Sequence, residues 1–125
     1  MRAPWSASAA ILALLASPIA AARGSDFGEV YVQDFHSDEP QSCTNADVSL
    51  SHAQARQFFV RSRPVSSRAI HDHYDVAPCY LEGTMRFRGR LADWKIQPSG
   101  IGLIIQGGRT RYYVCDSCDA MFERK

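Results

Sequence analysis

The fold is decided by residues 79–115, which read CYLEGTMRFRGRLADWKIQPSGIGLIIQGGRTRYYVC. Four short segments in this stretch alternate polar and apolar residues, which is the pattern of half-buried strands. Glycine-containing turns separate the segments, and glycine takes the positive φ that tight turns require. We therefore predict an antiparallel meander of four strands, at residues 80–88, 91–97, 101–106 and 110–115.

One face of this meander is expected to be buried. Ala92, Trp94 and Ile96 alternate with polar residues and therefore share a face of their strand. Trp94 and the pair Tyr112-Tyr113 could also form a shelf on which a ligand stacks, but aromatic side chains at alternating strand positions are more often part of a core. We expect Trp94 in the core.

A helix upstream of the meander supplies the cover for this face. It is predicted to begin near Ser51, whose hydroxyl can cap the amide of Gln54 while Gln54 reaches back. Pro64 ends the helix, because proline disfavours helical geometry in the residue before it. The apolar residues that share one face of this helix are Ala55, Phe58 and Phe59.

Two further segments complete the predicted architecture. Residues 27–35 alternate weakly and indicate a first strand, whereas residues 65–78 show no clean period and indicate an irregular crossing that could include one helical turn. We therefore expect an α+β fold, with one main helix packed on an antiparallel four- to five-stranded meander sheet that disulfides staple together.

The first 22 residues have the features of a signal peptide. Arg2 gives a positive start, residues 9–16 are apolar, and the small residues Ala20 and Ala22 fit cleavage before Arg23. The apolar run is far shorter than the roughly 20 residues that span a bilayer. We expect residues 1–22 to be removed and residues 23–125 to form one small domain, periplasmic or secreted.

The charge balance argues against some classes of partner. The chain has 14 basic and 13 acidic residues, and loss of a leader that carries Arg2 would leave equal numbers. Formal neutrality argues against a general role in binding nucleic acid or a membrane surface. The distribution is uneven, because six acids precede Arg56 whereas arginines cluster after it.

Four cysteines in an exported chain of this size predict two disulfides, for which sequence alone allows three pairings. We favour Cys43 with Cys79, which closes a long loop, and Cys115 with Cys118, which is local. Cys115 and Cys118 also have the spacing of a thiol-redox motif. Acidic neighbours such as Asp116 disfavour a reactive thiolate there, so a structural bond is the preferred interpretation.

Zinc is the alternative use of these cysteines. Cys115 and Cys118, together with two of His71, His73 and Cys79, would make a four-ligand set of suitable types. In an extended segment, His71 and His73 would share a face. Oxidising conditions disfavour free thiolates, so we expect no cofactor.

Arginines form a third candidate site. Arg86, Arg88 and Arg90 alternate along a predicted strand, so their guanidinium groups should project to one face, and Arg109 and Arg111 could extend the patch. Such a patch would dock an acidic protein, a carboxylate-rich peptide or an anionic glycan. The alternative is an ordinary solvent-facing sheet surface.

The functional expectation follows from these candidates. The sequence contains no recognisable nucleophile motif or phosphate loop, so an enzyme is not expected. We expect an exported, non-catalytic module that binds a protein in the cell envelope, such as an inhibitor or immunity-type protein. The alternatives are a structural or accessory component of the envelope and a thiol-redox or zinc-binding protein. Nucleic acid and membrane insertion are not expected.

The second half of the chain also carries a resemblance. Its residues are Ala77-Pro78-Cys79, Gly83, Trp94-Lys95-Ile96, Gly100-Ile101-Gly102 and Cys115-Asp116-Ser117-Cys118. In these it resembles small exported bacterial proteins of uncharacterised function, a resemblance that implies export but no activity. The layout of a helix followed by a meander is loosely similar to that of secreted inhibitor and immunity proteins.

Overall fold

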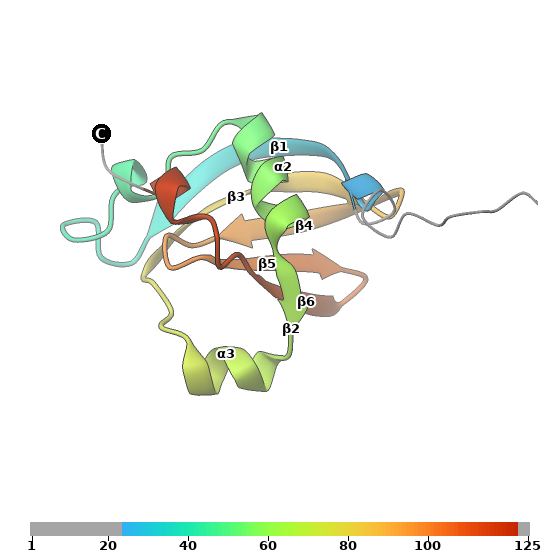
Figure 1. Ribbon diagram of the computed structural model, residues 1–125. Helices are drawn as coiled ribbons and strands as arrows, with labels where there is room; N and C mark the ends of the chain where they lie inside the picture. Colours follow the sequence, from blue (N-terminus) through green and yellow to red (C-terminus); the bar gives the residue numbers. More distant parts are fainter. Residues whose placement is uncertain (1–23, 123–125) are drawn as a thin grey trace, which may run out of the picture.

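The computed structural model describes residues 24–122 (Figure 1). The predicted signal peptide over residues 1–22, with its cleavage before Arg23, lies outside the described residues. The described residues form one antiparallel sheet of six strands, two α-helices and two short 3-10 helices. The fold is thus α+β, as the sequence predicts.

The strands lie in the order β1-β3-β4-β5-β6-β2 across the sheet. Their bounds are β1 (Phe27–Ser37), β2 (Arg63–Val65), β3 (Cys79–Phe87), β4 (Arg90–Ile96), β5 (Ile101–Gln106) and β6 (Arg109–Val114). The helices are α2 (His52–Arg61), α3 (Ser67–His73), η1 (Asn45–Asp47) and η2 (Asp119–Phe122). The predicted four-stranded meander is confirmed as β3 to β6.

The main helix begins as predicted. The Ser51 hydroxyl accepts a hydrogen bond from the Gln54 amide at 3.1 Å, and the Gln54 side chain accepts one from the Ser51 amide at 2.9 Å. This capping box satisfies amides that have no partner within the helix. The helix ends at Arg61, three residues before Pro64.

The prediction of one main helix and four to five strands is wrong in count, because α3 lies in the segment expected to be irregular and β2 ends where that segment begins, at Val65. Strand β2 is only three residues long, too short to show an alternating pattern, and it contains Pro64. Proline is tolerated there because β2 is an edge strand, which pairs with β6 alone. Helix α3 is capped by Ser66, whose hydroxyl accepts from the Ala69 amide at 3.1 Å.

Helix α2 crosses one face of the sheet and forms the main core with it (Figure 1). Phe58, Phe59 and Trp94 are fully buried, which confirms the core position expected for Trp94. The helix lies close to the sheet because Gly102 has no side chain. A Cβ at Gly102 would stand 2.6 Å from the Phe58 ring and 2.9 Å from the Phe59 ring.

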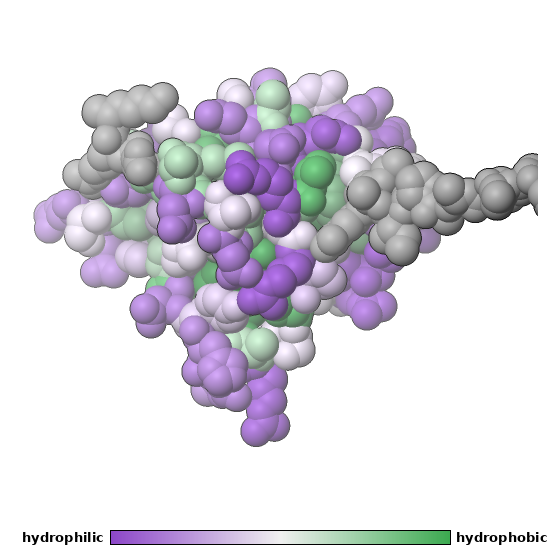
Figure 2. Space-filling view, viewed as in Figure 1, coloured by the Kyte–Doolittle hydropathy of each residue, from purple (hydrophilic) through white to green (hydrophobic). Residues whose placement is uncertain are grey.

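Helix α3 lies on the opposite face. Tyr113 of β6 contacts Phe59 of α2, whereas the next residue, Val114, packs with Ile70 of α3. Successive strand residues point to opposite faces, so the two helices cover different sides of the sheet. On the side of α2, Figure 2 shows mainly hydrophilic side chains over the helix, with hydrophobic ones visible between them.

The meander gives the sheet two distinct ends. One end, which we call the disulfide end, holds the start of β3 and the end of β6, with Cys79 and Cys115. The other, the arginine end, holds the start of β1, the β3–β4 turn and the β5–β6 turn. All five arginines singled out from the sequence lie at or near the arginine end: Arg86, Arg88, Arg90, Arg109 and Arg111.

Candidate functional site: the arginine groove

A groove of about 580 Å³ opens at the arginine end. Its walls come from the start of β1, the junction of β2 with α3, the β3–β4 turn and β6 from Arg109 to Tyr113. We call it the arginine groove, because Arg88, Arg109 and Arg111 line it. Its volume is within the usual range for sites that hold a ligand or a short peptide segment.

The turn between β3 and β4 places the first of these arginines. Arg88 and Gly89 form a two-residue loop with φ of 54° and 82°, the left-handed conformation of a type I′ turn. Asparagine and glycine suit the first of these positions, and an arginine there costs about 1 kcal/mol. Arginine at position 88 therefore lowers the stability of the turn relative to asparagine or glycine.

This turn also corrects the geometry expected for the arginine row. Arg86 is in β3, Arg88 is in the turn, and Arg90 is the first residue of β4. The three guanidinium groups therefore do not project from one face of a single strand. Only Arg88 of the three lines the groove.

The Phe87 ring orients two of the groove's arginines. Its centroid lies 4.7 Å from Cζ of Arg88 and 5.4 Å from Cζ of Arg111. The ring itself is fully buried, so its position is fixed by the core. Guanidinium groups are attracted to aromatic faces, which favours these two side-chain positions before any ligand arrives.

The groove has more cations than anions. Among the residues that the structure describes, Asp26 supplies the one carboxylate that lines it, and its Oδ2 lies 3.4 Å from Nε of Arg88. Within residues 24–122, Arg109 and Arg111 contact no carboxylate and donate no side-chain hydrogen bond, although Arg111 is partly buried. The hydroxyls of Ser67 and Thr110 in the walls likewise have no hydrogen-bond partner within the described part of the chain.

The wall formed by the start of β1 is held from α2. Arg56 donates from Nε to the Phe27 carbonyl and from Nη2 to the Gly24 carbonyl, both at 2.9 Å. The Arg88 amide donates to the Asp26 carbonyl at 2.8 Å. These bonds fix the backbone on either side of Asp26.

The two remaining arginines of the predicted site lie outside the groove. Arg86 pairs with Glu29, with 3.2 Å between Nε and Oε2. Arg90 is exposed and contacts no carboxylate within residues 24–122. The structure therefore separates the five arginines into three that converge and two that do not.

The cysteines are paired as favoured from the sequence. Cys43 is bonded to Cys79, and Cys115 is bonded to Cys118. All four residues are buried. An attacking thiolate would have to reach a buried sulfur, so the geometry suits a structural bond better than a redox couple.

The loop that contains Cys115 and Cys118 is also held by two arginines. Arg61 donates from Nη2 to the Ser117 carbonyl at 2.9 Å, and Arg63 donates from Nε to Asp116 at 2.7 Å. The hydrogen bond and the charge of Asp116 together raise the pKa of Arg63 above its ordinary value.

The predicted zinc set of His71, His73, Cys115 and Cys118 is not brought together. The two sulfurs are bonded to each other, and the histidines lie on α3 rather than on an extended segment. Residues two apart on a helix do not face one another. Among the described residues, no three His, Cys, Asp or Glu side chains are grouped closely enough to hold a metal ion.

No family model, curated protein or solved structure matches the chain. Helices within residues 24–122 are all too short or too polar to cross a membrane. The arginine groove is therefore the feature of the described chain that bears most directly on function.

Sequence reasoning recognised the groove's arginines and its Tyr112-Tyr113 pair but missed polar residues of the walls, among them Asp26, Ser67 and Thr110. Asp26 lies 62 positions before Arg88, and only the pairing of β1 with β3 brings them together. A weak signal existed in Arg88-Gly89, since an X-Gly pair between alternating segments predicts a two-residue turn.

Proposed function

We propose that the protein is an exported, non-catalytic binding module whose arginine end docks an acidic protein in the cell envelope, as an inhibitor or immunity-type protein would. The observation that carries this proposal is the arginine groove, where Arg109 and Arg111 converge without a carboxylate partner in the described chain. Guanidinium groups left without partners at a concave site are suited to carboxylates of a second molecule.

The chemistry of the lining supports binding rather than catalysis. The groove presents guanidinium groups, hydroxyls and the half-buried aromatic side chain of Tyr112. These groups orient and neutralise an anion, and aromatic and arginine side chains are enriched where protein interfaces bind most tightly. Two disulfides support a location outside the cytoplasm.

Rigidity supports the same proposal. The groove is built on β1, β2, β6 and the β3–β4 turn of a six-stranded sheet, and Arg88 and Arg111 are placed by a buried ring. A site that is organised in advance loses little conformational entropy when its partner binds. The concentration of positive charge at one end also speeds the approach of an acidic partner.

The proposal is tested by photo-crosslinking in the cells that export the protein. A photoreactive residue in place of Thr110, in the groove wall, should give one defined protein adduct, and the same residue in place of Asp93, exposed on β4, should not. Arg109→Glu should abolish the Thr110 adduct without unfolding the domain, because Arg109 is exposed and makes no side-chain hydrogen bond, ion pair or ring contact in the described chain.

Equal adducts at both positions, or none at either, would contradict the proposal. Charge reversal at Arg88 should also weaken binding without unfolding. Arg109 is the cleaner position, because Arg88 also contacts Asp26 and Phe87.

A further inference from the structure

We propose that the arginine groove binds a carboxylate of an acidic peptide segment and that Asp26 is a built-in competitor, which the incoming carboxylate displaces from Arg88. This inference rests on the proposed function and names the chemistry of the ligand and the regulation of the site. Its observations are the position of Asp26 in the groove and the absence of a carboxylate partner for Arg109 and Arg111 in the described chain.

The Asp26–Arg88 contact is of a kind that a ligand can replace. The closest approach is 3.4 Å, through Nε alone, whereas a carboxylate that fits a guanidinium fork makes two shorter bonds. The side chains of Asp26 and Arg88 are 28% and 55% exposed, so water weakens their attraction. Arg88 therefore keeps donors available for a carboxylate that approaches along the groove.

The same contact indicates a peptide rather than a sulfated glycan as the ligand. Asp26 shows that a carboxylate carried on a peptide backbone can reach the Arg88 guanidinium inside the groove. The carboxylate of a peptide ligand could therefore reach Arg88 in the same way. Tyr112 of β6 also lines the groove and is half-buried, whereas the neighbouring rings of Phe27 and Tyr113 are buried in the core. An apolar side chain beside the ligand's carboxylate would pack on the Tyr112 ring.

Asp26 cannot be removed from the groove by moving the backbone, because Arg56 and the Arg88 amide hold that backbone. The displacement that we propose is a rotation of the Asp26 side chain alone. It leaves the start of β1 in place and exposes Arg88 to the ligand together with Arg111, which lies against the same Phe87 ring.

The chain provides matched controls for both halves of the inference. Arg90→Gln and Arg111→Gln each remove one positive charge from the arginine end, but only Arg111 lines the groove. Asp26→Asn and Glu29→Gln each remove a carboxylate from an ion pair at this end, but only Asp26 lines the groove.

The experiment measures the affinity of the purified mature protein for fluorescein-labelled octaglutamate by anisotropy, with octaglutamine as the uncharged peptide. Arg111→Gln should weaken binding at least about tenfold, and Arg90→Gln by less than about threefold. Asp26→Asn should strengthen binding at least about threefold, and Glu29→Gln by less than about twofold. Arg109→Gln should also weaken binding, which keeps the test decisive if Arg111→Gln fails to fold.

Several results would overturn the inference. Equal losses for Arg90→Gln and Arg111→Gln would mean diffuse attraction rather than a site. Weaker binding by Asp26→Asn would mean that Asp26 positions Arg88 instead of competing for it. A heparin octasaccharide that displaces octaglutamate at an equal concentration of charges would assign the groove to a glycan, and no binding of octaglutamate would remove the site. A Thr110 crosslink that persists in any of these cases would leave the proposed function standing.

Discussion

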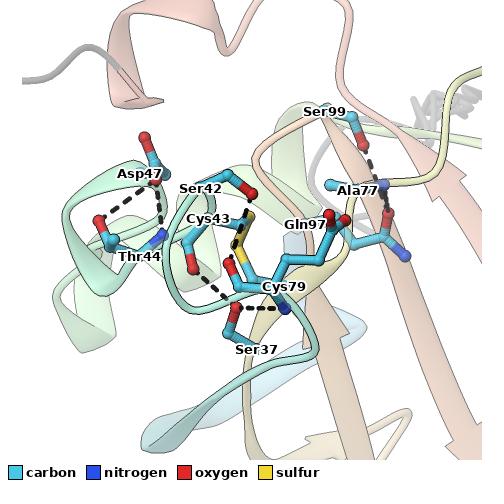
Figure 3. Close-up of a disulfide and its surroundings, with 10 residues drawn as sticks. Ser37, Ser42, Cys43, Thr44, Asp47, Ala77, Cys79, Gln97 and Ser99 are labelled. Atoms are coloured by element: carbon cyan, nitrogen blue, oxygen red, sulfur yellow. Dashed lines mark hydrogen bonds between the residues drawn. A yellow bond between two sulfur atoms is a disulfide. The ribbon is translucent and has the colours of Figure 1, made fainter.

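At the disulfide end of the sheet, long connections are tied down by covalent bonds and hydrogen bonds, whereas at the arginine end the connections are as short as a hairpin allows. Figure 3 shows the Cys43–Cys79 disulfide at the first of these ends. Beside it, the Ser37 hydroxyl donates to the Cys43 carbonyl at 2.7 Å, and the Ala77 amide donates to Gln97 at 2.9 Å. The arginine end has two-residue turns and no disulfide.

The two ends have different roles: the disulfide end contributes stability, and the arginine end carries positive charge. Small domains are only marginally stable, so several like charges at one place are a significant cost. Residues 24–122 place Arg88, Arg109 and Arg111 around one groove with a single carboxylate. The disulfides lie at the far end of the same strands, where they stabilise the sheet without occupying the surface that we propose for binding.

The largest expected effect comes from breaking the disulfide end. Removing one disulfide with Cys43→Ala and Cys79→Ala should lower the free energy of unfolding by about 3 to 4 kcal/mol, because the bond closes a loop with a sequence separation of 36. Urea unfolding measures the loss. Octaglutamate binding at low temperature, where the variant remains folded, should stay within about twofold of the parent, since the groove is at the other end.

Cys115→Ala with Cys118→Ala is the matched control. This bond spans a separation of only 3 residues, so its removal should cost about 2 kcal/mol. A comparable loss from both disulfides would show that loop closure is not the reason for the larger effect. A loss of binding in either folded variant would show that the two ends are coupled.

The next largest effect is expected at the arginine end, from Arg88→Asn. In this variant we expect binding to weaken while stability is unchanged or higher. Arg88→Asn places asparagine at φ 54°, a conformation that this residue tolerates well. The backbone gains about 1 kcal/mol. The lost contacts with Phe87 and Asp26 cost about 0.5 to 1 kcal/mol. The free energy of unfolding should therefore be unchanged or higher by up to about 0.5 kcal/mol, while octaglutamate binding falls about tenfold.

Arg88→Lys is the control for this variant. It keeps the charge and the backbone strain, so the stability should not rise, and part of the binding should remain. If Arg88→Asn unfolds more easily by more than about 1 kcal/mol, the arginine is needed for the turn itself, and its strained conformation is no argument for a binding role.

The sequence predicted the parts of the fold that depend on local patterns. Alternation and glycine turns located β3 to β6, and Ser51 with Gln54 located the start of α2. The favoured pairing of the four cysteines is also confirmed, although sequence alone allowed three pairings. Local rules suffice for these elements.

The remaining features depend on contacts between distant residues. Strand β2 exists because Arg63, Pro64 and Val65 pair with the end of a meander that follows nearly fifty residues later, and three residues have no period of their own. The arginine groove requires Asp26 and Arg88 to meet through β1 and β3. The arginines were recognised as a group, but a strand pattern could not show that a turn would separate Arg86, Arg88 and Arg90.

The smallest expected effect is at the disulfide end, from Arg63→Gln. Arg63 is bonded to Asp116 and to the Tyr74 hydroxyl, both at 2.7 Å, and its pKa is raised by the hydrogen bond and charge of Asp116. Because the folded-state pKa lies above the unfolded-state value, the contribution of Arg63 is complete at every pH below the unfolded-state pKa and is lost only as the pH rises through the folded-state pKa. Arg63 is half-exposed, so the variant should shift the thermal midpoint by less than about 3 °C, equally at pH 6 and pH 9.

Octaglutamate binding should not change in Arg63→Gln, although this variant loses the same charge as Arg111→Gln. A loss of binding similar to that of Arg111→Gln would show that total charge, and not the arginine end, determines affinity.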